Sequence, residues 1–152
     1  MPVKTSQGRQ RDAVIQFSVF TPNRIGRLND LVRVLATQNV HVLALTVLDA
    51  TDSAIIRIVL DDPEKARALL QEQEFPFTES PLVVVEVNAA DELSRLMSAL
   101  LEAELNISYL YSFIPHPNGK SILGLNMEDN EMAEQILKRH QFSVLRQADI
   151  SR

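Results

Sequence analysis

The apolar positions at the start of the chain change from a period of two residues to a helical period. Ile15, Phe17 and Val19 alternate with polar neighbours, which predicts a strand over residues 13–20. Leucines and valines at helical spacing then predict a helix over residues 26–38 with one apolar face. The chain therefore begins with a strand that leads into an amphipathic helix.

Four further elements complete the first half of the chain. Alternating or continuous apolar runs predict strands over residues 40–48, 54–60 and 77–80, with a helix between the last two. Asp62 and Pro63 mark the start of that helix. Aspartate is a favoured helix cap, and proline at the first helical position loses no hydrogen bond because its N–H would have no partner there.

The second half of the chain repeats the same order of elements. The predicted strands cover residues 82–87, 107–113, 120–127 and 143–149, and the predicted helices cover residues 91–104 and 129–139. Residues 118–119, Asn-Gly, are a strong hairpin turn signal. Asp62 matches Asp129 as a helix cap, and Phe75 matches Phe142. The sequence thus contains two copies of a βαββαβ pattern.

A βαββαβ unit predicts an α+β fold of the ferredoxin-like type. We expect two such units side by side, forming an antiparallel sheet of about eight strands with the helices on one face. The expected boundaries are a flexible N-terminal tail at residues 1–11, a first domain at 12–80 and a second at 81–152. Only Pro81 separates the two patterns, so we expect one rigid body. The remaining open edges predict a homodimer.

Short motifs in both copies resemble those of a known family. They are "NRIGRL", "QNVHV" and "LDDPEKA" in the first copy, and "AELNISYLYSF" and "MEDNEMA" in the second. In this order, from about residue 12 onward, the chain resembles a tandem pair of ACT domains. The resemblance implies amino-acid-binding regulatory modules, with ligand sites where the first loop of one unit faces a neighbouring unit. Ile25 departs from the pattern, because the family usually has proline there.

The turn before the first helix is the candidate ligand site. Its residues are Asn23, Arg24, Ile25, Gly26, Arg27 and Leu28. The first amides of a helix have no internal partner and carry partial positive charge, which suits a small carboxylate. Gly26 lets the backbone come close to the ligand, and the side-chain oxygen of Asn23 would accept from an ammonium group. The alternative is an ordinary turn with solvated arginines.

The corresponding loop of the second copy, residues 88–93, contains neither glycine nor arginine. Asp91 and Glu92 stand at its helix start instead. Acidic side chains favour the positive end of a helix and repel an incoming anion. We therefore expect one amino-acid-binding loop per chain; the sequence does not say whether residues 88–93 bind anything else.

Tyr109 and Tyr111 are the candidate ligand contacts in the second copy. They alternate along a predicted strand with Ile107, so the pattern places all three on one face. The matching positions of the first copy are the small residues Ala44 and Thr46. We expect the tyrosines to wall a ligand site at the seam between the units; the alternative is that they are ordinary core residues.

Composition and charge exclude several classes of partner. The formal charge is −5, from 15 basic and 20 acidic residues, so the chain has no general attraction for nucleic acid or anionic membranes. The predicted third strands of both copies lack the aromatic residues on which RNA-recognition domains stack bases. No apolar run approaches the roughly 20 residues of a membrane span. The absence of cysteine fits the reducing cytoplasm, where we expect the protein.

No pattern in the sequence predicts catalysis, a metal ion or a cofactor. His41, His116 and His140 are far apart and lack the spacing of a metal-binding pair, so we expect them on the surface. Asp61 and Asp62 are explained by helix capping. We therefore expect a non-catalytic regulatory protein that senses a free amino acid and has a metabolic enzyme as its partner. The alternative is a protein-binding regulatory subunit of an amino-acid biosynthetic enzyme, such as acetolactate synthase, with no ligand of its own.

Overall fold

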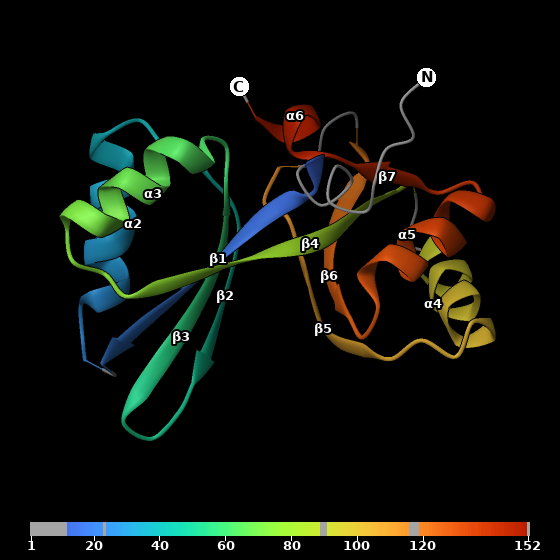
Figure 1. The fold of residues 1–152 in the computed structure, drawn as a ribbon, viewed down its shortest axis with the longest axis horizontal. Helices are drawn as coiled ribbons and strands as arrows, with labels where there is room; N and C mark the ends of the chain where they lie inside the picture. Colours follow the sequence, from blue (N-terminus) through green and yellow to red (C-terminus); the bar gives the residue numbers. More distant parts are fainter. Residues whose placement is uncertain (1–11, 23, 89–90, 116–118, 152) are drawn as a thin grey trace. The chain divides into compact units, whose positions relative to one another are not determined.

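The computed structural model describes residues 12–22, 24–88, 91–115 and 119–151. In chain order the elements are β1 (Val14–Pro22), α2 (Arg27–Thr37), β2 (Val42–Asp49), β3 (Ser53–Leu60), α3 (Pro63–Glu72), β4 (Phe77–Val87), α4 (Glu92–Glu102), β5 (Ile107–Ser112), β6 (Ser121–Met127), α5 (Asn130–Arg139), β7 (Ser143–Leu145) and α6 (Gln147–Ile150) (Figure 1). The order βαββαβ is present twice, as the periodicity predicted.

The described residues divide into two compact units, residues 15–80 with residue 151 (the first unit) and residues 81–150 with residues 12–14 (the second unit). The hydrogen-bonded strand order is β2-β3-β1-β4 in the first unit, and in the second unit β4 pairs with both β7 and β6, which continues to β5. The strand pairs are antiparallel. The predicted α+β fold with ferredoxin-like units is confirmed.

The described residues contain seven strands, where the sequence pattern indicated about eight. The expected strands at 77–80 and 82–87 are one continuous strand, β4, that passes from the first unit into the second. Pro81 lies within it, just before the pairing with β6 begins at Val83. The missing N–H of Pro81 therefore leaves that ladder intact, and the proline does not end the strand.

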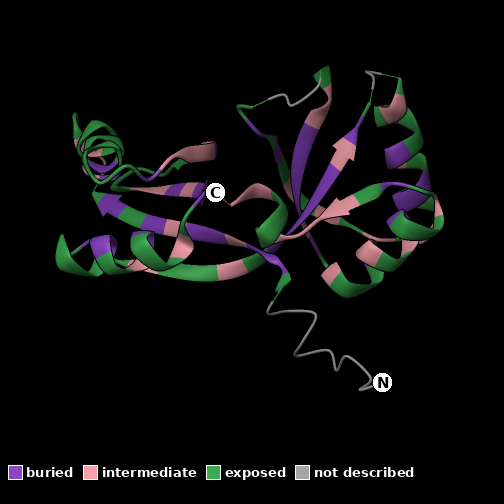
Figure 2. Cartoon of the chain, turned by 90° about the horizontal axis from the view of Figure 1, so that it is seen from above, coloured by how far each residue is buried: buried purple, intermediate pink, exposed green. Residues whose placement is uncertain are grey.

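Each unit buries one face of its sheet beneath two helices. In the first unit Leu31 and Leu35 of α2 pack with Phe17 and Val19 of β1. The helices α4 and α5 and the strands β4 and β6 of the second unit contribute a separate cluster of the same kind. Figure 2 shows the buried residues within the strands and along one side of the helices, whose other side is exposed. Burial of these apolar stripes holds the helices on their sheets.

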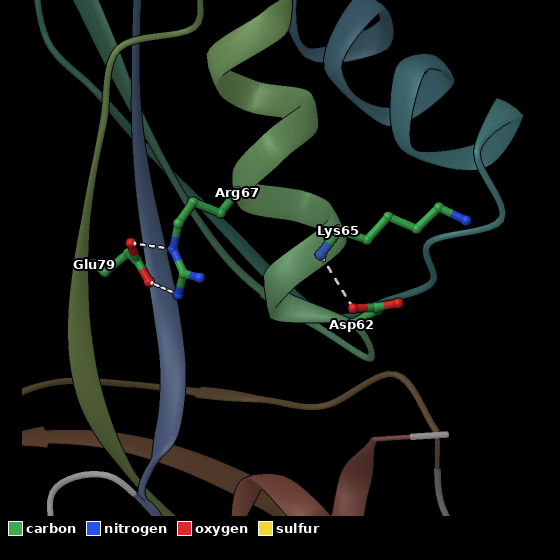
Figure 3. A network of polar contacts seen from close by, with 4 residues as sticks. All are labelled: Asp62, Lys65, Arg67 and Glu79. Atoms are coloured by element: carbon green, nitrogen blue, oxygen red, sulfur yellow. Dashed lines mark hydrogen bonds and ion pairs between the residues drawn. The ribbon is translucent and has the colours of Figure 1, made fainter.

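Both predicted helix caps are present. The side chain of Asp62 accepts a hydrogen bond of 3.1 Å from the amide of Lys65, as Figure 3 shows. Asp129 accepts an equivalent bond of 3.0 Å from the amide of Met132. The second helix of each unit therefore begins with the same side-chain cap.

The end of the chain differs from the predicted strand at 143–149. Strand β7 ends at Leu145, and the short helix α6 follows it. The amide of Arg146 donates to Asp149 Oδ2 at 2.6 Å, and the amide of Asp149 donates to the carbonyl of Arg146 at 2.9 Å. These local hydrogen bonds satisfy backbone groups within a turn. Such a turn competes with the hydrogen bonds that an extended strand would make to its neighbour.

The prediction that Ile107 shares a face with Tyr109 and Tyr111 is wrong. The β5–β6 register shifts between Ile107 and Tyr109 at a bulge. Ile107 packs against the core beneath the helices, whereas Tyr109 and Tyr111 lie on the opposite face of the sheet. One extra residue in a strand inverts the faces of all residues beyond it, and an alternating pattern does not reveal it.

Helix α3 is joined to the first part of β4 by an ion pair. Arg67 Nε and Nη2 donate to the two carboxylate oxygens of Glu79 at 2.8 and 2.6 Å (Figure 3). These hydrogen bonds lower the pKa of Glu79 and raise the pKa of Arg67. The pair is about one third exposed on both sides, so solvent screens much of its energy.

The packing predicts very different costs for two adjacent leucines of α4. Leu100 is 2% exposed and Leu101 is 77% exposed. Replacing Leu100 by Ala should lower the free energy of unfolding by about 2–5 kcal/mol, because it leaves a cavity. Replacing Leu101 by Ala should change it by no more than about 0.5 kcal/mol. Urea unfolding of both variants measures the difference, and equal losses would contradict the described orientation of α4.

The Arg67–Glu79 pair predicts a stability difference that depends on pH. Because the folded-state pKa of Glu79 is lowered, its stabilising contribution is present above the unfolded-state pKa and is lost as the pH falls through the folded-state value. Glu79→Gln should therefore cost about 0.5 kcal/mol at neutral pH. It should cost nothing in acid below both values. Denaturant unfolding of the wild type and the variant at both pH values tests this, with Glu72→Gln as an exposed control. If the loss of unfolding free energy persists in acid, it arises from packing and not from the ion pair.

Candidate functional site

The turn before α2 is built around Gly26, the residue that precedes the helix. Its φ angle is 94°, in the left-handed region, where a side chain would strain the backbone. Its carbonyl accepts the hydrogen bond of 2.8 Å from the amide of Asp30. The space where a Cβ would lie is open, with nothing within 4 Å. The backbone angle therefore favours glycine here, and the absence of a side chain leaves the helix start accessible.

The first amides of α2 are open. Within the described part of the chain, no residue accepts a hydrogen bond from the amide of Leu28 or Asn29, and Gly26 has no side chain to cap them. The amide of Arg27 makes only a long contact of 3.4 Å with the carbonyl of Arg24. Amides at this end of a helix combine free donors with partial positive charge. The arrangement can accept a small anion such as a carboxylate.

The side chains of Arg24, Ile25 and Leu28 differ in how far they are exposed. The side chains of Arg24 and Ile25 are exposed, and the side chain of Ile25 is not part of the hydrophobic core. The side chain of Leu28, on the first turn of α2, is also partly exposed. Asn23, the predicted partner for an ammonium group, lies outside the described residues.

Arg27 is held at the helix start by two contacts. Its guanidinium carbon lies 4.6 Å from the centre of the Phe75 ring, and Nη1 lies 3.6 Å from Asp30 Oδ2. The ring contact is of the cation–π type. Arg27 therefore keeps positive charge beside the open amides, although the contacts limit its reach toward a ligand.

The corresponding start of α4 carries an acid. Glu92 Oε2 accepts a hydrogen bond of 2.6 Å from the amide of Asn88, at the end of the preceding strand. This bond lowers the pKa of Glu92, so its carboxylate is charged at neutral pH. Asp91, just before the helix, makes no cap hydrogen bond with its side chain. An arriving anion would therefore meet negative charge here.

The two helix starts have the same ion-pair spacing with the charges exchanged. In α2 the order is Arg27 then Asp30, and in α4 it is Glu92 then Arg95. Arg95 also lies over a phenylalanine, with its guanidinium carbon 3.9 Å from the centre of Phe142, the match of the ring beneath Arg27. The first residue of the helix therefore carries a positive charge in the first unit and a negative charge in the second.

A small polar hollow of about 50 Å³ lies beside the start of α4. It is lined by Glu86, Asn88, Glu92, Arg95, Lys120, Gln141, Phe142 and Ser143. Lys120 Nζ lies 3.4 Å from Glu86 Oε1, and Arg95 Nη2 lies 3.4 Å from Glu92 Oε1. The charges of the hollow are thus paired within it. The sequence analysis missed it because the residues come from separate segments; Glu86 within an apolar strand was the only signal.

Tyr109 and Tyr111 lie next to each other on β5 of the second unit. Their rings are stacked with centres 6.3 Å apart, and Asn126 Nδ2 donates to Tyr109 Oη at 3.0 Å. Tyr111 is buried. Their role as ligand contacts stays a prediction.

Asp61 does not act as a helix cap, in contrast to the sequence-based explanation. It is buried, and its oxygens accept from the amide of His41 at 2.8 Å and bind His41 Nδ1 at 2.7 Å. At the matching place in the second unit Asn106 Nδ2 donates to Glu128 Oε2 at 3.2 Å. Both pairs join the start of the second strand to the end of the third. Their repetition with different residues indicates a structural link, which sequence alone did not reveal.

The described ranges lack two further kinds of site. Those ranges contain no group of three or more His, Cys, Asp or Glu residues placed to hold a metal ion. None of their helices has the length and hydropathy needed to span a bilayer.

Comparison with known proteins places these features in a family. Residues 12–152 match the family model of the ACT domain pair. Among solved structures, protein BT0572 from Bacteroides thetaiotaomicron has a TM-score of 0.82 and 26% identity, covering 91% of this chain and 95% of that chain. A comparison with curated proteins found no match.

Two regulatory subunits of aspartate kinase have a similar fold. The regulatory subunit of aspartate kinase from Thermus thermophilus, in its ligand-free form, has a TM-score of 0.60 and 15% identity, covering 86% of this chain and 91% of that chain. The one from Thermus flavus has a TM-score of 0.57 and 16% identity, with coverages of 86% and 92%. At this identity the likeness concerns the fold alone. With two βαββαβ units within the matched residues, the chain belongs to the ACT domain pair family, whose fold is that of a regulatory domain.

Proposed function

We propose that this ACT domain pair is a regulatory protein that binds a small free amino acid at the start of α2. The observation that carries the proposal is the pair of open amides of Leu28 and Asn29 beside the left-handed Gly26. A carboxylate there would accept two charge-assisted hydrogen bonds, worth about 1.5–3 kcal/mol each. After the costs of association, this suits dissociation constants in roughly the micromolar to millimolar range.

Two arginines near the helix start, and the contact residues predicted from the sequence, complete the proposed ligand contacts. Arg24 is exposed in the same turn, and Arg27 is held at the helix start. The side-chain oxygen of Asn23 accepts from the ammonium group of the ligand. The contact of Tyr109 and Tyr111 with the side chain of a ligand stays a prediction from the sequence. The proposed domains are residues 12–80 and 81–152. Binding changes the association of the protein with a metabolic enzyme in the cytoplasm.

The second unit takes no part as a carboxylate receptor in this proposal. Glu92 occupies the first position of α4 and accepts from the amide of Asn88. Its negative charge at the helix start opposes a second anion by Coulomb repulsion. One amino acid therefore binds per chain.

The alternative function is that of a regulatory subunit without a ligand, which binds an amino-acid biosynthetic enzyme such as acetolactate synthase. Its support is the shared fold with the regulatory subunits of aspartate kinase. The two functions differ in one observable property. Only the first requires the free protein to be stabilised by an amino acid.

Thermal unfolding in the presence of each common amino acid tests the proposed function. A ligand that binds only the native state stabilises it by about 2.7 kcal/mol at a concentration 100 times its Kd. This should raise the Tm by roughly 5–11 °C for a chain of this size. We expect one amino acid or a related group to do so. Unchanged melting with all of them, together with binding to a purified enzyme partner, would establish the alternative.

The exchanged charges at the helix starts allow a matched pair of variants. Arg27→Glu places in α2 the acid that α4 has at its first position, and it should abolish the stabilisation by the amino acid. Arg95→Glu removes the arginine over Phe142 in the second unit, a comparable structural loss, and should leave the stabilisation intact. Titration calorimetry with the amino acid found in the thermal screen measures both. Retained binding in Arg27→Glu would exclude the start of α2 as the site.

A further inference from the structure

Helix α2 carries exposed apolar side chains next to the open amides at its start. Leu28 and Val32 are four residues apart, which places them on one flank of the helix. They are 37% and 38% exposed, whereas Leu31 between them is buried. Arg27 lies on the other flank, because its guanidinium contacts the ring of Phe75, which follows α3. The flank of Leu28 and Val32 therefore faces away from α3.

Strand β2 adds a third apolar side chain on the same face of the sheet. Val47 of β2 stands directly opposite Ile56 of β3, so the two side chains share a face. Ile56 belongs to one core cluster with Leu31 of α2, and this face is therefore the one that α2 covers. In the described strand order β2 is the outermost strand of the unit, and Val47 is 46% exposed.

The start of α2 and Val47 lie at the same end of the first unit. Ile56 also pairs with Val19, three residues before the end of β1, and the turn into α2 follows that end. Figure 1 shows the start of α2 and the turn between β2 and β3 at one end of the unit, toward the bottom of the view. We call Leu28, Val32 and Val47 the α2–β2 apolar patch.

The α2–β2 apolar patch contains no charged side chain. Arg27 and Asp30 form their ion pair on another side of the helix. Asp49, two residues beyond Val47, is engaged in an interaction of its own. A charged side chain of a ligand would lose hydration on this patch without gaining an ion partner. An aliphatic side chain would gain free energy there by leaving water.

The second unit does not combine these features. Its outer strand has Ser112 where the first unit has Val47, because Ser112 pairs with Leu123, the match of Ile56 in the repeat. Glu92 also places a negative charge at the start of its helix. Within the described residues, open amides at a first helix and an apolar patch with valine on the outer strand therefore occur together in the first unit alone.

From these observations we infer that the amino acid bound at the start of α2 has an aliphatic side chain, like that of valine, leucine or isoleucine, which lies on the α2–β2 apolar patch. The inference rests on the proposed function and adds the class of ligand to it. The carboxylate and ammonium groups are common to all amino acids, so contacts with the side chain decide among them. Each methylene that leaves water on the patch strengthens binding.

Titration calorimetry of the full chain with alanine, valine, leucine and isoleucine tests the inference, with serine, aspartate and lysine for comparison. A fully buried methylene is worth roughly fourfold in affinity, so leucine should bind about tenfold or more tightly than alanine even when partly buried. Stronger binding of serine, aspartate or lysine than of leucine would overturn the inference and leave the proposed function in place. If none of the amino acids binds, both are overturned.

A matched pair of variants on β2 locates the side chain of the ligand. Val47→Ser introduces the residue type of the second unit, and it should weaken the binding of leucine roughly fivefold while changing that of alanine little. Leu48→Ser removes a side chain that is 50% exposed on the opposite face of the same strand, and it should change neither affinity. Thermal unfolding without ligand checks that both variants fold. Equal effects of the two variants would contradict contact with the patch.

Arg27→Glu separates the head group of the ligand from its side chain. This variant acts on the carboxylate, so it should abolish the binding of alanine and leucine alike, whereas Val47→Ser should discriminate between them. If Val47→Ser weakens both ligands by the same factor, the patch does not hold the side chain, and the inference fails although the site at the start of α2 remains.

Discussion

The burial of two leucines from the first helix of each unit is the contact on which the other features depend. Leu31 and Leu35 lie in the core of the first unit, and Leu96 and Leu100 hold the matching places in the second. Because these side chains fix the rotation of each helix on its sheet, they also decide which residues stay outside. The exposure of Leu93 and Leu101 on α4 follows from that rotation.

The two helix starts show that matching positions in two repeats of one fold can carry opposite charges. Arg27 and Asp30 in α2 exchange their signs for Glu92 and Arg95 in α4, while an arginine lies over the matching phenylalanine in both units. The acid at the start of α4 agrees with the helix dipole and accepts a backbone hydrogen bond, which stabilises the unit. Arginine at the start of α2 opposes the dipole and stabilises the helix less. An anion-binding site at the start of α2 would explain why arginine stands there although it stabilises the helix less.

The edges of the units are stabilised by pairs that differ in chemistry but join the same places. His41 with Asp61, and Asn106 with Glu128, each connect the outer strand of a unit to its neighbour. Both outer strands also carry a bulge near their start. The outer strand is thus fixed in place on its own sheet.

Local sequence patterns were sufficient to predict the order of helices and strands as far as β7, the caps Asp62 and Asp129 and the twofold repeat, because these depend on residues close together in the chain. It also identified the turn at Gly26, since a left-handed backbone and an open helix start have local signals. The bulge beside Tyr109, the continuity of β4 through Pro81 and the His41–Asp61 link could not be read in this way. Each of them depends on which strand lies alongside, and pairing between segments far apart in the chain is set by tertiary packing, which a one-dimensional pattern does not contain.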